Sequence, residues 1–411
     1  MDVLVERCCG LDVHRDTVVA TVRTPEDRGR RRQQTRTFRS TLSQLEELGD
    51  WLVDLGVTLV GMEATGVYWK PVFSTLERRL ECWLLNAQHL HNVPGRKTDV
   101  ADSAWICQLL EHGLVRPSFV PPPEIRDLRD LTRLRKAHTE ERTRAIQRLE
   151  KVMQDAGVKL TSVASQAFSK SARAIVEAML AGTTDPEVLA ELARGRLRSK
   201  IPALREALAN RFRIEHHGAL AATLLAHIDA VDAALSVLDD RIAERTVPVA
   251  EVLELACTIP GVARRTAEVL LAECGPDMSR FVTSAHLASW AGICPGNNES
   301  GGKRGSGRSR PGSKWLRHAL TEAAWAAARA KGTYLAAHHA QVRGRRGRAK
   351  AVGTTRHDIL VAYFHVVRDR VPFHDLGPDW LAARFSIEHR TARLVRQLEA
   401  LGHSVSLDPV A

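Results

Sequence analysis

The sequence has few aromatic residues and few cysteines. Aromatic residues make up 5% of the 411 residues, and the seven cysteines include no Cys-x-x-Cys pair. Such a scattered set does not suit a disulfide framework or a zinc knuckle, so we expect small buried thiols in a reducing compartment. The chain also lacks an uninterrupted apolar run long enough for a membrane span and a recognisable signal peptide. These absences predict a soluble, cytoplasmic protein with no membrane partner.

Length and charge indicate several domains and a polyanionic partner. With 411 residues, 44% of them hydrophobic, the chain exceeds one ordinary core, and two or three domains are expected. The formal net charge is +11. A surplus of this sign favours nucleic acid as the partner.

Residues 1–116 have the pattern of an α/β domain. We predict strands over residues 3–14, 17–24, 34–39, 57–63 and 81–86, and helices over 42–55, 68–80 and from about 98 to 111. Three strands followed by alternating helices and strands resemble the order of the ribonuclease-H-like arrangement. In that arrangement the first and fourth strands are neighbours, and a later helix lies across their ends.

Four carboxylates stand where this arrangement would bring them together. Asp12 lies near the end of the first predicted strand and Glu63 at the tip of the fourth, while Asp99 and Asp102 are spaced i and i+3 on the last helix. Acids that close repel one another unless a cation lies between them, and oxygen ligands favour Mg²⁺ or Mn²⁺. The alternative is that acids in a first helical turn only complement the helix dipole.

The rest of the chain is predicted to be helical. Residues 117–248 are expected to form a linker and a helical or coiled-coil region, because a triple-proline segment precedes a long charged helix with an apolar stripe. Residues 249–375 are expected to form a mostly helical domain, and residues 376–411 a tail. Around Gly261 the sequence resembles a helix-hairpin-helix, whose turn exposes backbone N–H groups to phosphate, although a plain helical hairpin remains open.

The basic surplus concentrates in this second half. Residues 292–313 are rich in glycine, serine, lysine and arginine, a composition that allows close contact with a phosphate backbone but by itself favours a disordered loop. The candidate nucleic-acid contacts are Gly261, Lys303, Arg304, Arg308, Arg310, Lys314, Arg343, Arg345 and Arg346.

Several segments together resemble one known family. They are Gly10–His14, Gly61–Trp69, Lys97–Asp102, Ile259–Pro295 and Glu299–Gly305. In this order, and over most of residues 3–370, the sequence is similar to the DEDD transposases of insertion-sequence family 110. The resemblance implies an N-terminal RuvC-like catalytic domain and a C-terminal transposase domain with a nucleophilic serine. In some members a structured bridge RNA pairs with donor and target DNA.

The resemblance implies that the catalytic metal ligands are Asp12, Glu63, Asp99 and Asp102. It also implies that the nucleophile is Ser300. We expect Ser300 to attack a DNA phosphodiester while the metal stabilises the developing charge. Because Ser300 is far in sequence from the acids, a composite site in a homodimer or homotetramer is expected. The implied partners are double-stranded DNA of the element ends and target, and a bridge RNA, in a prokaryotic cytoplasm near the nucleoid.

Two other classes of protein remain open. A metal-dependent junction nuclease would cut DNA with the acids and water, and its serine loop would only bind. A basic nucleic-acid-binding protein without catalysis would not depend on metal. A covalent protein–DNA adduct that needs Ser300 distinguishes the recombinase from both, and Ser306 or Ser309 would be the next nucleophile to test.

Overall fold

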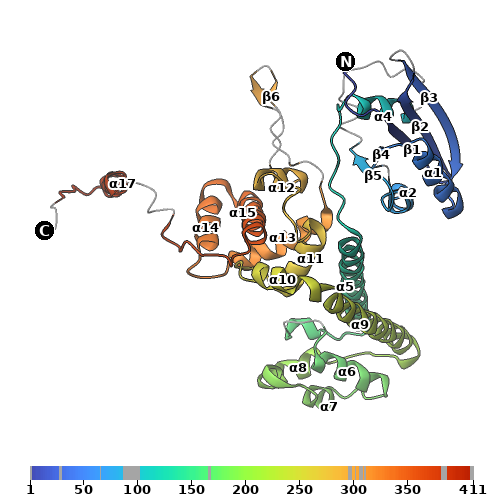
Figure 1. Ribbon diagram of the computed structural model, residues 1–411. Coiled ribbons are helices and arrows are strands. Elements are labelled where there is room, and N and C mark those ends of the chain that lie inside the picture. Colours follow the sequence, from blue (N-terminus) through green and yellow to red (C-terminus); the bar gives the residue numbers. More distant parts are fainter. Residues whose placement is uncertain are drawn as a thin grey trace. The chain divides into compact units, whose positions relative to one another are not determined.

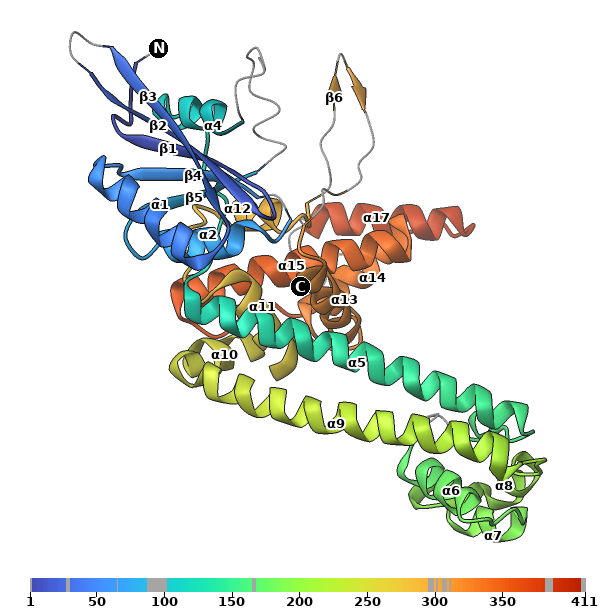
Figure 2. The ribbon, with the colours of Figure 1, turned by 90° about the vertical axis from the view of Figure 1, so that its right-hand side faces the viewer.

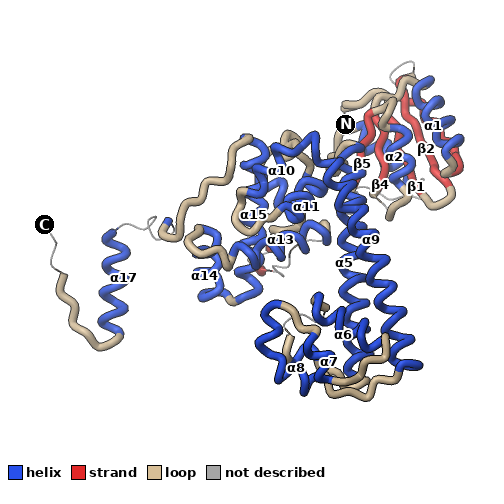
Figure 3. Tube along the Cα trace, turned by 90° about the horizontal axis from the view of Figure 1, so that it is seen from below, coloured by secondary structure: helices blue, strands red, loops and turns tan. Residues whose placement is uncertain are grey.

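The computed structural model describes residues 2–26, 30–64, 66–86, 102–164, 168–294, 299–300, 302–304, 309, 312–380 and 387–407. The chain divides into two compact units, residues 1–120 and 121–411. Strands concentrate in the first unit, and helices make up most of the second (Figures 1 and 3).

The first unit is a five-stranded sheet with helices on both faces. Its elements are β1 (Cys8–Val13), β2 (Thr17–Pro25), β3 (Arg31–Arg39), α1 (Leu42–Asp54), β4 (Leu59–Glu63), α2 (Trp69–Leu76), β5 (Glu81–Leu85) and α4 (Asp102–Glu111). The strand order is β3-β2-β1-β4-β5, in which β1 pairs antiparallel with β2 and parallel with β4. The predicted ribonuclease-H-like strand order, with the first and fourth strands adjacent, is therefore confirmed.

Alternation along β1 separates the two faces of the sheet. Leu11 is buried in a core with Leu48 of α1 and Val72 of α2. Cys8 points to the opposite face, where its Sγ lies 3.6 Å from Sγ of Cys107 on α4. The helices α1 and α2 thus cover one face and α4 covers the other (Figure 1).

A buried ion-pair cluster fixes the end of α4. Glu111, the last residue of this helix, is almost fully buried, and its Oε2 lies 2.9 Å from Nε of Arg23 on β2. Its other carboxylate oxygen pairs with Arg31 on β3. Because a buried carboxylate is costly without cationic partners, this cluster holds the C-terminal end of α4 over β2 and β3.

The second unit is helical apart from one short hairpin among its described residues. Its helices are α5 (Pro123–Asp155), α6 (Lys170–Leu180), α7 (Pro186–Glu191), α8 (Ile201–Ala207), α9 (Ala219–Thr246), α10 (Ala250–Cys257), α11 (Arg264–Cys274), α12 (Ser284–Trp290), α13 (Lys314–Ala327), α14 (Tyr334–Arg346), α15 (Arg348–Asp369) and α17 (Ile387–Ala400). Short helical turns span Leu160–Ser162, Gly195–Lys200, Ile214–Gly218 and Val247–Val249. The hairpin is β6 (Glu299–Ser300) and β7 (Lys303–Arg304).

The long helices α5 and α9 lie side by side and antiparallel (Figure 2). Arg142 Nη2 donates to Asp232 Oδ2 at 3.0 Å, and Arg135 Nη1 donates to Asp239 Oδ1 at 3.1 Å. By length and composition alone, the helical segment Ile214–Cys257 would be a candidate membrane span. Asp232 and Asp239 of this segment are instead paired with arginines of α5, and the helices α5 and α9 together form an arm of the second unit.

A helical bundle of α10 to α15 follows the arm. Its central helix is α15, which packs against α10, α12, α13 and α14. Tyr363 and Phe364 of α15 are fully buried, and the Tyr363 hydroxyl donates to the carbonyl of Gly275 at 3.0 Å. The helix α15 therefore forms the buried centre of this bundle.

Candidate catalytic and nucleic-acid-binding sites

Asp12 and Glu63 occupy matching positions on two neighbouring parallel strands. In the β1–β4 pair, Gly10 lies opposite Gly61, and each acid follows its glycine by two residues. Residues two apart on a strand face the same side of the sheet. The two carboxylates therefore share the face of the two glycines, at the carboxyl ends of both strands.

The two glycines face α4, which leaves no space for a side chain. A Cβ on Gly10 would overlap the carbonyl oxygen of Ser103, and a Cβ on Gly61 would lie 2.6 Å from Cδ1 of Leu110. The hydroxyl of Ser103 also lies 2.8 Å from the hydroxyl of Thr21, the β2 residue opposite Gly10. The helix α4 is thus seated directly on the face that carries the two acids.

The direction of α4 brings its first residue toward these acids. Ser103 lies over Gly10 in the middle of β1. Glu111 is paired with Arg23, which lies opposite Cys8 at the start of β1. The helix therefore runs opposite to β1, and Asp102 lies toward the end of the sheet that carries Asp12 and Glu63. Three predicted ligands from three segments share one end and one face of the sheet.

The fourth predicted acid, Asp99, lies outside the described residues. Asp12 is paired with His14, whose Nε2 lies 3.1 Å from the aspartate Oδ2. The sequence pattern did not indicate this partner. Asp12 is half-buried, with 26% of its side chain exposed, so it is held at the surface of the strand end. Oxygen donors fixed on rigid strand ends suit a hard divalent cation such as Mg²⁺.

Ser300 lies in the short antiparallel hairpin β6–β7, where it is opposite Lys303. Gly302, between the two strands, has a φ of 75°, a conformation that glycine adopts without strain. At the base of the segment, a Cβ on Gly312 would lie 2.6 Å from the carbonyl carbon of Ala291. The two ends of the serine-containing segment, residues 292–313, are therefore in direct contact.

Side chains from three helices hold this base. The Ser313 hydroxyl donates to Glu273 Oε2 at 2.9 Å, and Arg133 of α5 binds both oxygens of the same carboxylate, at 2.8 and 2.9 Å. At the other end of the segment, Arg317 Nη2 donates to the carbonyl of Gly292 at 2.9 Å. Sequence reasoning missed Glu273 and Arg133, because their pairing joins positions 140 residues apart.

Gly261 lies in the turn between α10 and α11, with a φ of 87°. A Cβ on this residue would overlap the carbonyl oxygen of Ala323 and lie 2.6 Å from the amide nitrogen of Ala327. The helical hairpin is present, and its turn packs closely on α13. This close packing explains why position 261 is a glycine. That the turn binds phosphate stays a prediction.

The predicted basic contacts fall into three groups. Lys303 and Arg304 form β7, and Arg308 and Arg310 lie outside the described residues. Lys314 begins α13, with its Nζ 4.9 Å from the centre of the Trp315 ring. The last turn of α14 contains Arg343, Arg345 and Arg346, all exposed.

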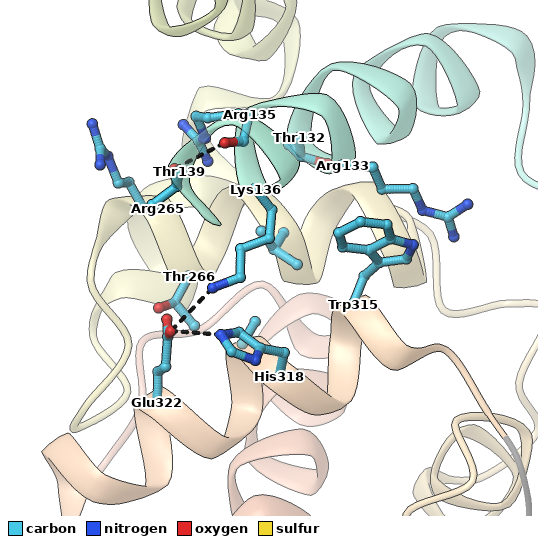
Figure 4. A pocket seen from close by; sticks show the side chains of 12 residues that line it. Thr132, Arg133, Arg135, Lys136, Thr139, Arg265, Thr266, Trp315, His318 and Glu322 are labelled. Carbon is cyan, nitrogen blue, oxygen red and sulfur yellow. Dashed lines mark hydrogen bonds and ion pairs between the residues drawn. The ribbon is translucent and has the colours of Figure 1, made fainter. Parts of the chain in front are cut away.

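A pocket of about 150 Å³ lies between α5, α11 and α13 (Figure 4). Lys136 Nζ and His318 Nε2 both approach Glu322 Oε1, at 3.5 and 2.7 Å. Arg135 Nη1 lies 2.6 Å from Glu268 Oε2, and Arg265 Nη2 lies 2.8 Å from Asp239 Oδ2. Because these cations already have acidic partners, the pocket is a junction between helices and a poor polyanion site.

Asp155, His216 and His217 also bring potential metal-binding atoms within 4.8 Å of one another. Nδ1 of His217 accepts the backbone N–H of Arg213 at 3.0 Å, which places its proton on Nε2, 3.2 Å from Asp155 Oδ2. Neither ring nitrogen then has a free lone pair for a metal. The cluster links the end of α5 to the helical turn before α9.

Both units match models of one protein family. Residues 9–157 match the IS110-type DEDD model described as "Transposase", and residues 253–340 match "Transposase IS116/IS110/IS902 family". The matched ranges together cover more than half of the chain, and both models are models of transposases. The chain belongs to the IS110 family of transposases.

One similar protein comes from Streptomyces coelicolor and has the name "Insertion element IS110 uncharacterized 43.6 kDa protein". The two sequences are 43% identical over 70 residues. The aligned segment is 17% of this chain and spans 17% of the length of that protein.

Proposed function

We propose that this protein is a transposase that cuts DNA at the ends of an insertion sequence and at a target, and rejoins it in a new order. Membership of the IS110 family supports this class of reaction. The observation that carries the proposal is that Asp12, Glu63 and Asp102 share one end and one face of the sheet. Three carboxylates in such an arrangement suit phosphoryl transfer assisted by a divalent cation.

The four acids, including Asp99, would hold Mg²⁺ or Mn²⁺. Such a cation, when bound, stabilises the negative charge that develops on a phosphate under attack. The protein contributes rigid placement, because β1 and β4 fix Asp12 and Glu63 and the seating of α4 on Gly10 fixes Asp102. His14, in contact with Asp12, orients that carboxylate.

Ser300 is the proposed nucleophile. Its Oγ would form a bond to phosphorus while the bond from phosphorus to a deoxyribose oxygen breaks. The serine proton passes to a base, and the sugar leaves as a free hydroxyl. The phosphoserine linkage conserves the energy of the phosphodiester bond, so a second sugar hydroxyl can rejoin the strand.

A site composed from two subunits of a homodimer or homotetramer is part of the proposal, because Ser300 lies far in sequence from the acids. Double-stranded DNA of the element and the target is the proposed substrate, and the exposed arginines of α14 and the basic hairpin are its proposed contacts. A bridge RNA as guide rests on the family resemblance alone.

An adduct assay tests the proposal. Purified protein is incubated with Mg²⁺ and labelled element-junction DNA, with and without RNA from the flank of the element, and a denaturing gel shows whether label stays with protein. We expect an adduct that Ser300→Ala and Asp102→Asn abolish and that Asp16→Asn retains, since Asp16 is an exposed acid of the β1–β2 turn. Cut DNA without an adduct would replace the recombinase with a hydrolytic nuclease.

A further inference from the structure

A second pocket, of about 680 Å³, opens at the surface between α13, α14 and α15. Three arginines border it: Arg329 just beyond α13, Arg343 on α14 and Arg348 at the start of α15. Small residues line the space between them, namely Ala328 just beyond α13 and Ala336, Ala340 and Gly344 of α14. The pocket is separate from the junction between α5, α11 and α13, and the proposed bond-making and bond-breaking at Ser300 does not involve it.

Among the described residues, the cations of this pocket have no acidic partners. Arg329, Arg343 and Arg348 are all exposed, and in the described part of the chain none of them forms an ion pair. The basic residues of the pocket in Figure 4, by contrast, are paired with glutamates and aspartates. Cations gathered around one opening repel one another, and an anion between them relieves that repulsion.

An aromatic wall holds one of the arginines in place. The Arg348 guanidinium lies over the Trp325 ring, with Cζ 4.4 Å from the ring centre. Trp325 in turn packs on His339, whose Nδ1 is 3.0 Å from the Thr355 hydroxyl. A guanidinium stacked in this way keeps its N–H edge free, in the planar form that binds phosphate through two hydrogen bonds.

The start of α15 adds backbone donors at the same place. This helix spans Arg348–Asp369, has no side-chain cap at its N-terminus and has no acid in its first turn. Its first N–H groups and its dipole therefore favour an anion beside Arg348. Burial and Arg343 lower the pKa of His339, so the imidazole under the pocket is neutral at neutral pH.

We propose that this pocket binds a backbone phosphate of nucleic acid and anchors the strand away from the reacting groups. Arg345 and Arg346, in the same last turn of α14, extend the positive surface beyond one phosphate, which favours a polymer over a free anion. The inference rests on the proposed function only in that the bound polymer is nucleic acid. It adds Trp325, Arg329 and Arg348 to the binding residues.

The test measures binding of the full chain to fluorescent oligonucleotides by anisotropy, over a series of salt concentrations. Duplex DNA and RNA of the same sequence form two arms, because both carry the phosphodiester. Arg348→Gln and Arg343→Gln should each weaken binding about tenfold and reduce the slope of log affinity against log salt by about 1. Arg241→Gln is the charge-matched control, since Arg241 is an exposed residue of α9 paired with Glu244.

A second variant tests the stacking. Arg348→Lys keeps the charge but loses the planar fork, so it should weaken binding more than Arg343→Lys, which lacks an aromatic partner among the described contacts. Loss in one arm only assigns the pocket to DNA or to RNA. If Arg348→Gln binds both DNA and RNA as tightly as the wild-type protein does, the proposal is overturned.

The outcome is independent of the adduct assay. If wild-type protein forms no adduct but its binding depends on Arg348, the pocket stands and the recombinase proposal fails. If the adduct forms and Arg348→Gln binds both polymers like wild type, the pocket fails and the recombinase proposal stands.

Discussion

Ser313 and Glu273 are joined by a hydrogen bond of 2.9 Å from the serine hydroxyl to Oε2. The same hydroxyl accepts the backbone N–H of Leu316 and so caps α13. Glu273 is nearly fully buried at the end of α11 and is also bound by Arg133 of α5. One hydroxyl therefore connects the segment that carries Ser300 to three helices of the bundle.

Ser313→Ala should reduce formation of the protein–DNA adduct more than its effect on stability explains. Loss of an N-cap costs about 1 kcal/mol of unfolding free energy, and the segment also loses its tie to Glu273. Ser169→Ala is the matched control, because Ser169 caps α6 through the same kind of bond, at 3.2 Å from Ala172 N. Adduct rates and urea unfolding are measured for both variants. Equal adduct rates in the two would refute a positioning role for Ser313.

Gly10→Ala should destabilise the first unit and disturb the acid site. The new methyl group would overlap the carbonyl oxygen of Ser103 and lie 2.5 Å from the amide nitrogen of Cys107, so α4 must shift. Overpacking of this kind costs about 1–3 kcal/mol. Gly353→Ala is the control, since its nearest neighbour is a flexible arginine tip at 3.7 Å and alanine favours the helix. Urea unfolding should show a loss for the first variant and no loss for the second.

Asp12→Asn should have opposite effects on stability with and without metal. In EDTA the variant removes repulsion among clustered carboxylates, so its melting temperature should equal or exceed that of wild type. With Mn²⁺ the wild type should gain stability through binding to the folded state, and the variant should gain less. Asp16→Asn should behave like wild type in both conditions. A wild-type melting temperature that Mn²⁺ leaves unchanged would count against the metal site.

The His338–Asp358 pair should stabilise the α14–α15 contact in a defined pH range. Nδ1 of His338 lies 2.8 Å from Asp358 Oδ2, and this hydrogen bond raises the pKa of His338 above 6.5. Burial raises the pKa of Asp358, but hydrogen bonds from His338 and His357 outweigh it and hold that pKa below 3.8. The raised pKa of histidine gives stability that is complete below pH 6.5 and lost as pH rises through the folded value. The lowered pKa of aspartate gives stability that is complete above pH 3.8 and lost as pH falls.

His338→Gln should therefore cost more unfolding free energy near about pH 5.5 than near about pH 8.5. Urea unfolding of both proteins at the two values measures the difference. His374→Gln is a control with a histidine outside this pair. If His338→Gln lowers the unfolding free energy by the same amount at both pH values, the pair is not ionic.

The sequence predicted the topology of the first unit because apolar periodicity and chain order constrain a sheet strongly. It also predicted the long helix α5 and the helical hairpin around Gly261. It did not predict the β6–β7 hairpin, since a glycine-rich basic segment has no periodicity. The hydrogen bonds of Glu273 and the pocket beside Trp325 bring together residues that are far apart in the chain. Such contacts produce no local sequence pattern from which they could be predicted.

The glycines beneath α4 and the two acids Asp12 and Glu63 form a short sequence pattern that occurs twice in the chain. Gly10-Leu11-Asp12 and Gly61-Met62-Glu63 have the same form, a glycine two positions before an acid at the end of a buried strand. The absent side chains admit the helix, and the acids two positions later lie on the same face of the sheet as the helix. A motif of this form on adjacent parallel strands can therefore be used to search other sequences for carboxylate sites that a crossing helix completes.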